Sequence, residues 1–203
     1  MRSKTEERRQ RIVDIAAAAF REQGFENTSM AEIASRVGGS KATLYNYFPS
    51  KEALLVEVTL QAARDHIEQA FSLLKPDPDL RSVLQRFCEH ALRVFGSPAF
   101  ISMRRTVIAE SGRQGVGPLF YENGPGKGAV KIESYLSSAM ERGQLRQCDC
   151  RVAAQHLRGL TDAETLEPLL FRLVEEFTPE EISAIVSRAL DVFFAAYGPR
   201  DAG

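Results

Sequence analysis

Apolar residues recur at intervals of three and four along almost the whole chain, which is the spacing of one face of an α-helix. No stretch alternates apolar and polar positions in the way that a half-buried β-strand does. The first predicted helix ends at Gly24, and its apolar face consists of Ile12, Ile15, Ala16, Ala19 and Phe20. The pattern predicts an all-α protein.

Capping residues, prolines and glycines divide the rest of the pattern into further helices. The helix that begins near Lys51 is predicted to be long and to reach Leu74. Residues 112–128 are rich in glycine, and GPGKG at 124–128 within them is predicted to be an interhelical loop. Ser29 and Glu32 form a capping box at the start of the second helix, and Thr178-Pro179-Glu180-Glu181 opens the last one. After the first helix, helices are predicted to begin at Ser29, Ser40, Lys51, Asp77, Ser97, near Ile132, and at Asp149 and Thr178.

Composition adds little, because 203 residues with a formal net charge of −1 fit many folded proteins. No apolar run is long enough to span a membrane, and the N-terminus lacks a signal-peptide core, so we expect a soluble, cytoplasmic protein with no membrane partner. Three cysteines cannot form an even disulfide framework, in agreement with a reducing compartment. The first eleven residues form a basic tip that suits either a polyanion or solvent; its cations are Arg2, Lys4, Arg8, Arg9 and Arg11.

The segment SKATLYNYFPSKEALL, residues 40–55, places a lysine directly after each of two predicted helix N-caps. A cation is disfavoured in the first turn of a helix, where the macrodipole is positive. A bound phosphate would reverse this effect, because phosphates are held at helix N-termini and a nearby lysine adds charge. Lys41 and Lys51 therefore suggest an anionic partner, and Lys51→Ala is expected to preserve or slightly raise the stability of the free protein.

Two short helices joined by a glycine-containing turn and followed by a long helix form the pattern of a helix-turn-helix motif. In such a motif the second short helix, here 40–48, enters the major groove of DNA. The sequence therefore predicts double-stranded DNA as the anionic partner.

The segment AAAAFREQGFENTSMAEIASRVGGSKATLYNYFPSKEALL resembles the N-terminal DNA-binding domain of the TetR family of bacterial transcriptional repressors. The resemblance covers residues 8–58 and implies a DNA-binding domain at 1–55, followed by a helical ligand-binding and dimerisation domain at 56–203. It departs from the family pattern at Gly39, where valine is common, and at Asn46, where histidine is frequent. The DNA contacts that it implies are Thr28, Ser40, Lys41, Thr43, Tyr45, Asn46, Tyr47 and Lys51. Thr28 and Ser40 have an alternative role as caps only, and either tyrosine could instead pack its ring in the core.

Residues 99–146 also resemble the AefR-like type of C-terminal domain in this family, through RRTVIAESGR, LFYENGPGKGAV and RGQLR. This resemblance implies a homodimer that binds a palindromic operator and is released by a small-molecule effector, with no cofactor. Apolar or aromatic chemistry is expected for the effector, since ligand pockets are mostly apolar. The candidate pocket residues are Phe87, Phe100, Met103, Arg104, Phe120, Tyr121, Tyr135 and Met140. The wide apolar surface of the last helix, which includes Ile182, Val186 and Phe193, favours a dimer interface over burial within one chain.

Two other function classes remain open. Cys148, Cys150 and His156 could sense a metal or the redox state, although they supply only three local ligands and Asp149 is already explained as an N-cap. A small all-α enzyme is the other class, but GPGKG at 124–128 fits no phosphate-binding loop. His66, His90 and His156 have no nucleophile or carboxylate at a diagnostic spacing, so no catalytic residue and no metal site are assigned.

Overall fold

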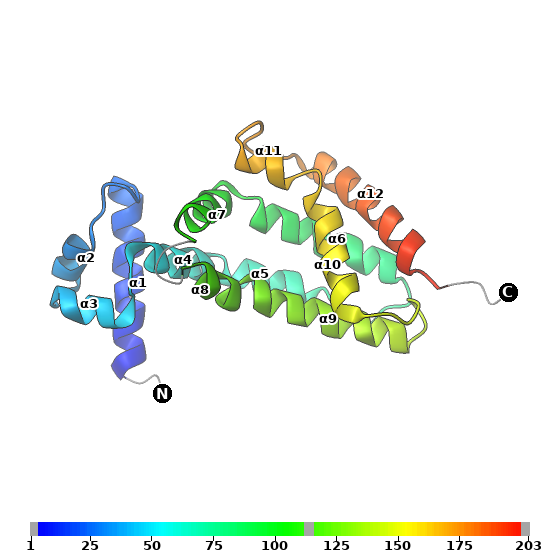
Figure 1. Cartoon of the computed structure of the whole chain (residues 1–203), viewed down its shortest axis with the longest axis horizontal. Coiled ribbons are helices and arrows are strands. Elements are labelled where there is room, and N and C mark those ends of the chain that lie inside the picture. The colour runs from blue at the N-terminus through cyan, green and yellow to red at the C-terminus, as the bar shows by residue number, and fades with distance from the viewer. Residues whose placement is uncertain (1–3, 112–115, 200–203) are drawn as a thin grey trace. The chain divides into compact units, whose positions relative to one another are not determined.

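The computed structural model describes residues 4–111 and 116–199, and every regular element in these ranges is a helix (Figure 1). This confirms the all-α prediction. In chain order the helices are α1 (Lys4–Gln23), α2 (Met30–Val37), α3 (Lys41–Tyr47), α4 (Lys51–Ala62), α5 (Arg64–Ser72), α6 (Leu80–Phe95), α7 (Pro98–Glu110), α8 (Val116–Asn123), α9 (Pro125–Glu141), α10 (Cys150–Asp162), α11 (Leu166–Leu170) and α12 (Pro179–Tyr197).

The long helix predicted from Lys51 to Leu74 is wrong, because the structure interrupts it at Ala63 and begins α5 at Arg64. The loop predicted for 124–128 is also wrong, because Gly124 is the N-cap of α9 and residues 125–128 form its first turn. Earlier in the glycine-rich segment, α8 is helical and residues 112–115 lie outside the described ranges. Two features of the sequence favour the helical start of α9. Pro125 occupies the first turn, where its missing N–H is not needed, and Gly128 allows the Phe71 ring to approach closely. The five-residue helix α11 was not predicted.

The chain divides into two compact units, one formed by residues 1–62 with 103–122 and the other by 63–102 with 123–203. The boundary predicted between residues 55 and 56 lies seven residues before the first division. Each unit has its own core of buried apolar side chains.

In the first unit, α1 packs against α2 and α4, and α2 packs against α3. The core consists of residues from all four helices and from Phe48, which follows α3: Ile12, Val13, Ala16, Met30, Ile33, Ala34, Val37, Leu44, Phe48 and Leu54. Arg9 on α1 donates two hydrogen bonds to the Glu57 carboxylate on α4, at 3.0 and 2.7 Å. The Arg9 guanidinium also lies 5.0 Å from the centre of the Phe48 ring, so one side chain links α1, α4 and the end of α3.

Lys51, the first residue of α4, is bound to the segment between α1 and α2. Its ammonium group donates to the backbone carbonyls of Phe25 at 2.8 Å and Glu26 at 3.3 Å. It also lies 4.3 Å from the centre of the Phe25 ring, within the range of a cation–π interaction. The half-buried lysine therefore fastens the start of α4 to this segment.

In the second unit, α12 packs against α6 and α10, α9 packs against α10, and α5 packs against α6. The Thr178 hydroxyl accepts from the Glu181 N–H at 3.2 Å and the Glu181 carboxylate accepts from the Thr178 N–H at 2.8 Å, so the predicted start of the last helix is a capping box. Asp149 caps α10 as predicted, because its carboxylate accepts from the Val152 N–H at 3.1 Å. Within the described residues, no helix has the length and apolar composition required to cross a membrane.

Phe193→Ala is expected to lower the free energy of unfolding by about 3–5 kcal/mol, because the fully buried ring would leave a cavity in the second core. The neighbouring Phe194→Ala is the matched control. Its half-buried ring lies beneath Arg81, and its loss is expected to cost about 1–2 kcal/mol. Denaturant unfolding followed by circular dichroism measures both values, and equal losses would contradict this description of the core.

Lys51→Ala is expected to lower the free energy of unfolding by about 1–3 kcal/mol, because two carbonyls lose a charged donor and Phe25 loses its cation. The sign is therefore opposite to the one expected from the helix dipole alone. Lys41→Ala is the control, since within the described part of the chain exposed Lys41 contacts only the Tyr45 ring, at 5.8 Å. Its removal is expected to change stability by less than about 0.5 kcal/mol. Denaturant unfolding of the two variants in the absence of DNA makes the comparison.

Candidate nucleic-acid interface

Helix α3 divides into an anchored side and an exposed side. Leu44 and Phe48 are buried in the first core, whereas Lys41, Tyr45 and Asn46 are exposed. Residues 41 and 45 lie one helical turn apart on the same face, and position 46 follows about 100° further round the helix. The structure therefore brings three of the predicted DNA contacts together on one solvent-facing surface.

The two tyrosines of α3 have different surroundings. Tyr45 is 42% exposed, and the Lys41 ammonium group lies 5.8 Å from the centre of its ring. Tyr47 is half-buried and packs against the first core. Of the two tyrosines, Tyr47 is therefore the one whose ring packs against the core.

Ser40 is the N-cap of α3. Its hydroxyl oxygen accepts from the Thr43 N–H at 3.1 Å and lies 2.8 Å from the Thr43 hydroxyl oxygen. A hydroxyl has one hydrogen and two lone pairs, so capping leaves each residue able to form a further hydrogen bond. Capping and DNA contact are therefore compatible roles for Ser40 and Thr43.

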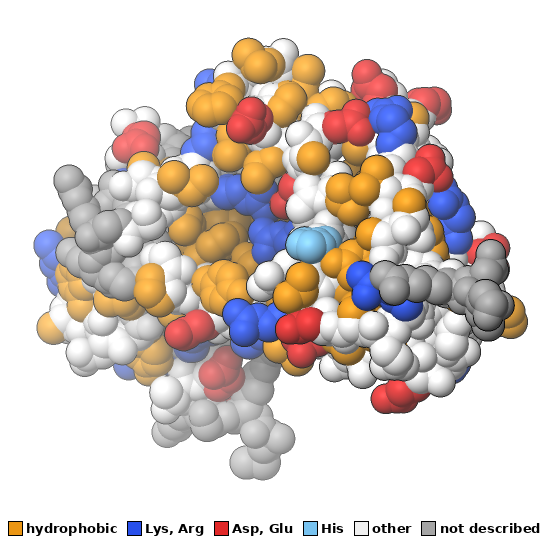
Figure 2. All heavy atoms as spheres, turned by 45° about the vertical axis from the view of Figure 1, so that its right-hand side comes forward, with side chains coloured by type: hydrophobic (Ala, Val, Ile, Leu, Met, Phe, Trp, Pro, Cys, Tyr) orange, Lys and Arg blue, Asp and Glu red, His pale blue; other side chains and the backbone are white. Residues whose placement is uncertain are grey.

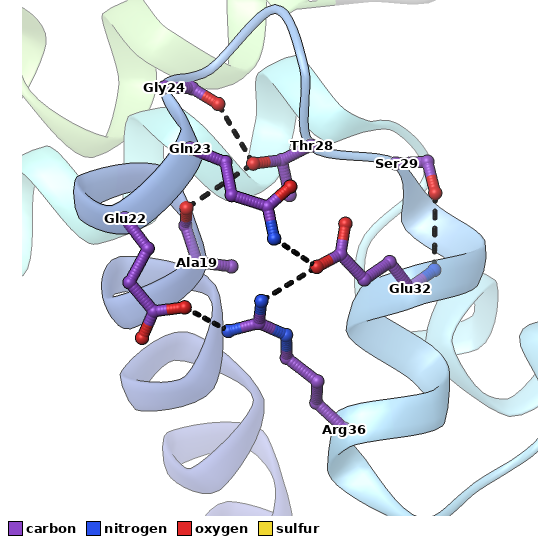
Figure 3. A network of polar contacts seen from close by, with 8 residues as sticks. All are labelled: Ala19, Glu22, Gln23, Gly24, Thr28, Ser29, Glu32 and Arg36. Atoms are coloured by element: carbon purple, nitrogen blue, oxygen red, sulfur yellow. Dashed lines mark hydrogen bonds and ion pairs between the residues drawn. The ribbon is translucent and has the colours of Figure 1, made fainter.

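Thr28 differs from the other predicted contacts because it is only 2% exposed (Figure 3). Its hydroxyl donates to the Gly24 carbonyl at 2.8 Å and lies 3.4 Å from the Ala19 carbonyl. The next residue, Ser29, is the N-cap of α2 and accepts from the Glu32 N–H at 3.1 Å. Thr28 thus secures the end of α1, and a DNA contact from its side chain would require this hydroxyl to leave the interior.

A network of charged and polar side chains fixes α2 against α1 (Figure 3). Arg36 donates to Glu22 on α1 at 2.6 Å and to Glu32 on its own helix at 2.7 Å. Gln23 also donates to Glu32, at 2.6 Å. This hydrogen bond lowers the pKa of the Glu32 carboxyl, and each Arg36 interaction lowers it by a smaller amount. The Glu32–Arg36 spacing of four residues indicates their pairing from sequence, whereas the link to Glu22 depends on the fold.

The two lysines that suggested an anionic partner are not equivalent. Lys51 already has partners in the free protein, because two carbonyls and an aromatic ring surround its ammonium group. Lys41 is exposed, and its one contact among the described residues is with a tyrosine ring. Lys41 is therefore the lysine of the pair that can approach a phosphate without breaking a hydrogen bond, and the role of either residue in DNA binding stays a prediction.

The basic tip of α1 also divides. Arg9 is held by Glu57, and their hydrogen bonds raise its pKa, with burial acting in the opposite direction. Arg8 and Arg11 are exposed beside a hollow of about 450 Å³ that Glu7, Val37 and Gly38 complete. Arg2 lies outside the described residues. The cluster of cations in the sequence indicated a basic surface at the start of α1, but it did not indicate which arginine is bound to a carboxylate.

Four of the predicted effector-pocket residues lie in the second unit. Phe87, Tyr135 and Met140 belong to its core, and Phe100 packs its ring against Phe95 with the ring centres 5.3 Å apart. The Tyr135 hydroxyl donates to the Lys75 carbonyl at 3.1 Å, and burial raises its pKa.

The other four pocket candidates, Met103, Arg104, Phe120 and Tyr121, are grouped with the first unit. Met103 is buried, whereas Tyr121 is 56% exposed. The second unit has a cavity of about 30 Å³ between α6, α11 and α12, which is room for water and far below the volume that a ligand needs. The eight candidates, all within the described ranges, do not line this cavity, so their role in effector binding stays a prediction.

Two of the three cysteines have surroundings that disfavour the thiolate. Burial raises the pKa of Cys88 to about 12 and also raises that of Cys148, while the thiolate is the reactive form. Cys150 contacts the Met140 sulfur at 3.6 Å, and His156 Nδ1 lies 2.5 Å from the Tyr197 hydroxyl. Among the described residues, no group of three or more His, Cys, Asp or Glu is positioned to hold a metal ion.

Two family models match the chain. Residues 12–58 match the model of bacterial regulatory proteins of the tetR family, and residues 82–199 match the C-terminal domain of AefR-like transcriptional repressors. An HTH-type transcriptional regulator of Staphylococcus aureus (strain USA300) is 40% identical over 77 residues, which are 38% of this chain and 41% of that protein. The matched segment thus spans about two fifths of the curated relative.

Solved structures extend the similarity to nearly the whole chain. A structure described as a putative TetR-family transcriptional regulator from Mesorhizobium loti is 28% identical, has a TM-score of 0.80, and the alignment covers 97% of this chain and 100% of that one. The flavonoid-responsive regulator FrrA is 31% identical with a TM-score of 0.72, over 96% of this chain and 99% of its own. From the helix-turn-helix unit, the two matched models and these relatives, the chain belongs to the TetR family of bacterial transcriptional regulators and has an AefR-like C-terminal domain.

Proposed function

We propose that the protein is a repressor that binds a palindromic operator as a homodimer and is released from it by a small-molecule effector. It acts by binding, without catalysis, on DNA in the cytoplasm. The observation that carries this proposal is the exposed face of α3, where Lys41, Tyr45 and Asn46 project from a helix held by Leu44 and Phe48.

Residues on this face would divide the work of DNA binding by their chemistry. The Lys41 ammonium group and the Ser40 and Tyr45 hydroxyls suit phosphate oxygens, which position a protein on the duplex without reading sequence. The Asn46 amide can donate to and accept from an adenine edge, which presents one acceptor and one donor in the major groove. Asn46 is therefore the side chain proposed to discriminate between base pairs.

A homodimer is proposed because a palindrome has two half-sites and each chain carries one helix-turn-helix motif. The α12 residues expected to form the interface, including Ile182, Val186 and Phe193, are buried within the single chain, so they no longer support the dimer. The support comes from apolar side chains that this chain leaves exposed. Val192 on α12 is 55% exposed, and Phe171 and Leu173 after α11 are 70% and 74% exposed. Figure 2 shows hydrophobic side chains over α11 and the turn that follows it, at the top of the view.

An apolar or aromatic effector is proposed because the related regulator FrrA is described as flavonoid-responsive and is similar to this chain over nearly its full length. By linkage, an effector that prefers a conformation with low DNA affinity must weaken DNA binding by the same factor by which DNA weakens effector binding. The cavity of about 30 Å³ between α6, α11 and α12 is too small for such a molecule and is not proposed as the effector site.

Wild-type protein is expected to select a palindromic duplex from a random pool and to bind it as two chains per site. Its affinity should fall steeply as salt rises, because bound phosphates release counterions. Sequencing of the selected pool and light scattering of the complex provide the measurement. Failure of folded protein to bind any duplex at low salt would refute the proposed function.

The same duplex also tests the proposed division of roles on α3, with Lys41→Ala as the control for Asn46→Ala. Asn46→Ala should weaken operator binding by about 1–3 kcal/mol more than it weakens binding to random DNA. Lys41→Ala should weaken both equally and make the salt dependence shallower by about one unit.

A flavonoid from a panel of related compounds is expected to raise the melting temperature of the protein and to release it from the selected operator. Phe100→Ala and Tyr121→Ala should reduce the apparent affinity for that flavonoid while operator binding stays near the wild-type value. Val130→Ala is the control, because this exposed apolar side chain on α9 is neither a predicted pocket residue nor one of those that support the dimer. Tyr121 is itself largely exposed, so the fold should survive its truncation; unchanged flavonoid affinity in both variants would show that the pocket assignment is wrong.

A further inference from the structure

The tip of α1 and the turn between α2 and α3 form a groove in the first unit, with a volume of about 450 Å³. We call this feature the arm groove; it is lined by Glu7, Arg8, Arg11, Val37 and Gly38. Arg8 and Arg11 lie three residues apart on α1, so their side chains share one face of the helix. The turn that forms the opposite wall leads through Gly39 to Ser40, the N-cap of α3. The arm groove is therefore adjacent in the chain to the proposed DNA-contact face.

The two glycines of this turn are present for different reasons. Gly38 has a φ of +75° and ends α2 in the left-handed conformation, which glycine adopts without strain. Gly39 is not among the residues with positive φ, so its backbone does not require glycine. Instead, a Cβ atom added to Gly39 would lie 3.0 Å from the Arg8 Nη2 atom. A side chain at position 39 would therefore require the tip of Arg8 to shift by a few tenths of an ångström, and glycine leaves the guanidinium in its present place beside the turn.

Arg8 and Arg11 are also available to a ligand. Neither side chain makes a hydrogen bond or ion pair within residues 4–111 and 116–199, and both are exposed. Arg9, between them in sequence, is held by two hydrogen bonds to Glu57. The Glu57 contacts of Arg9 fix α1 in the fold, and Arg8 and Arg11 take no part in these contacts. A guanidinium is planar and presents a fork of donors that suits two oxygens of one phosphate.

We propose that the arm groove is a second phosphate-binding site of this protein, occupied by a backbone phosphate of the same duplex on which α3 docks. The inference rests on the proposed DNA-binding function and extends it to residues outside α3. Arg8 and Arg11 bind the phosphate oxygens, and Gly39 acts as a positioning residue because it leaves the space that Arg8 fills. Glu7 lines the same groove, so its carboxylate opposes the phosphate and limits the affinity.

The test uses the full-length protein and the duplex that it selects, with binding measured over a series of salt concentrations. Arg8→Gln and Arg11→Gln should each make the slope of log K against log salt shallower by about one unit, and by the same amount on operator and random DNA. Arg21→Gln is the matched control, since this exposed arginine is on α1 but about 20 Å further along it and should leave the slope unchanged. Glu7→Gln should act in the opposite direction and strengthen binding to both duplexes.

The role of Gly39 is tested by Gly39→Val with and without Arg8→Gln. A valine side chain there would displace the guanidinium, so the effect of Arg8→Gln on the slope should be smaller when Gly39→Val is also present. Melting curves of the variants without DNA check that each is folded, and the arginine variants decide the proposal even if Gly39→Val does not fold. If the wild-type protein binds DNA but Arg8→Gln and Arg11→Gln have the same slope as Arg21→Gln, the arm groove is not a phosphate-binding site. The proposed function would then still stand. A wild-type protein that binds no duplex would overturn both.

Discussion

The burial of Leu44 and Phe48 is the constraint on which the proposed interface depends. Both side chains enter the core that α1, α2 and α4 share, and this burial fixes the rotation of a helix only seven residues long. A helix of this length is not stable alone in water, so its exposed face exists only because its other face is buried. The orientation of Tyr45 and Asn46 toward solvent is thus a consequence of core packing.

Polar contacts then restrict how the helices around α3 can move. Arg36 connects α2 to α1 through Glu22, Arg9 connects α1 to α4 through Glu57, and Lys51 connects α4 to the segment after α1. Ion pairs at a surface contribute little stability, so we attribute to the first two a role in alignment more than in strength. The Lys51 contact is half-buried and involves carbonyl groups, and it is accordingly expected to matter for folding.

The arginines near the start of α1 differ in their surroundings although they are close neighbours in the sequence. Arg9 is used by the fold, whereas Arg8 and Arg11 face the arm groove without partners among the described residues. In the second unit, by contrast, aromatic side chains such as Phe87 and Tyr135 are used by the core. The DNA-binding unit thus displays its candidate contacts, whereas these two pocket candidates of the second unit are buried.

The sequence by itself determined the all-α class, the helix-turn-helix and the caps at Ser40, Asp149 and Thr178, because helical periodicity and capping are local properties of a few neighbouring residues. It also identified most of the exposed face of α3. Only the tertiary structure decided that the helix after Lys51 breaks at Ala63 and that the segment GPGKG at 124–128 begins a helix. It also decided that Lys51 and Thr28 stabilise the fold. These outcomes depend on partners distant in sequence, such as Phe25 for Lys51 and Phe71 for Gly128, and a local pattern contains no information about which distant residue will be adjacent.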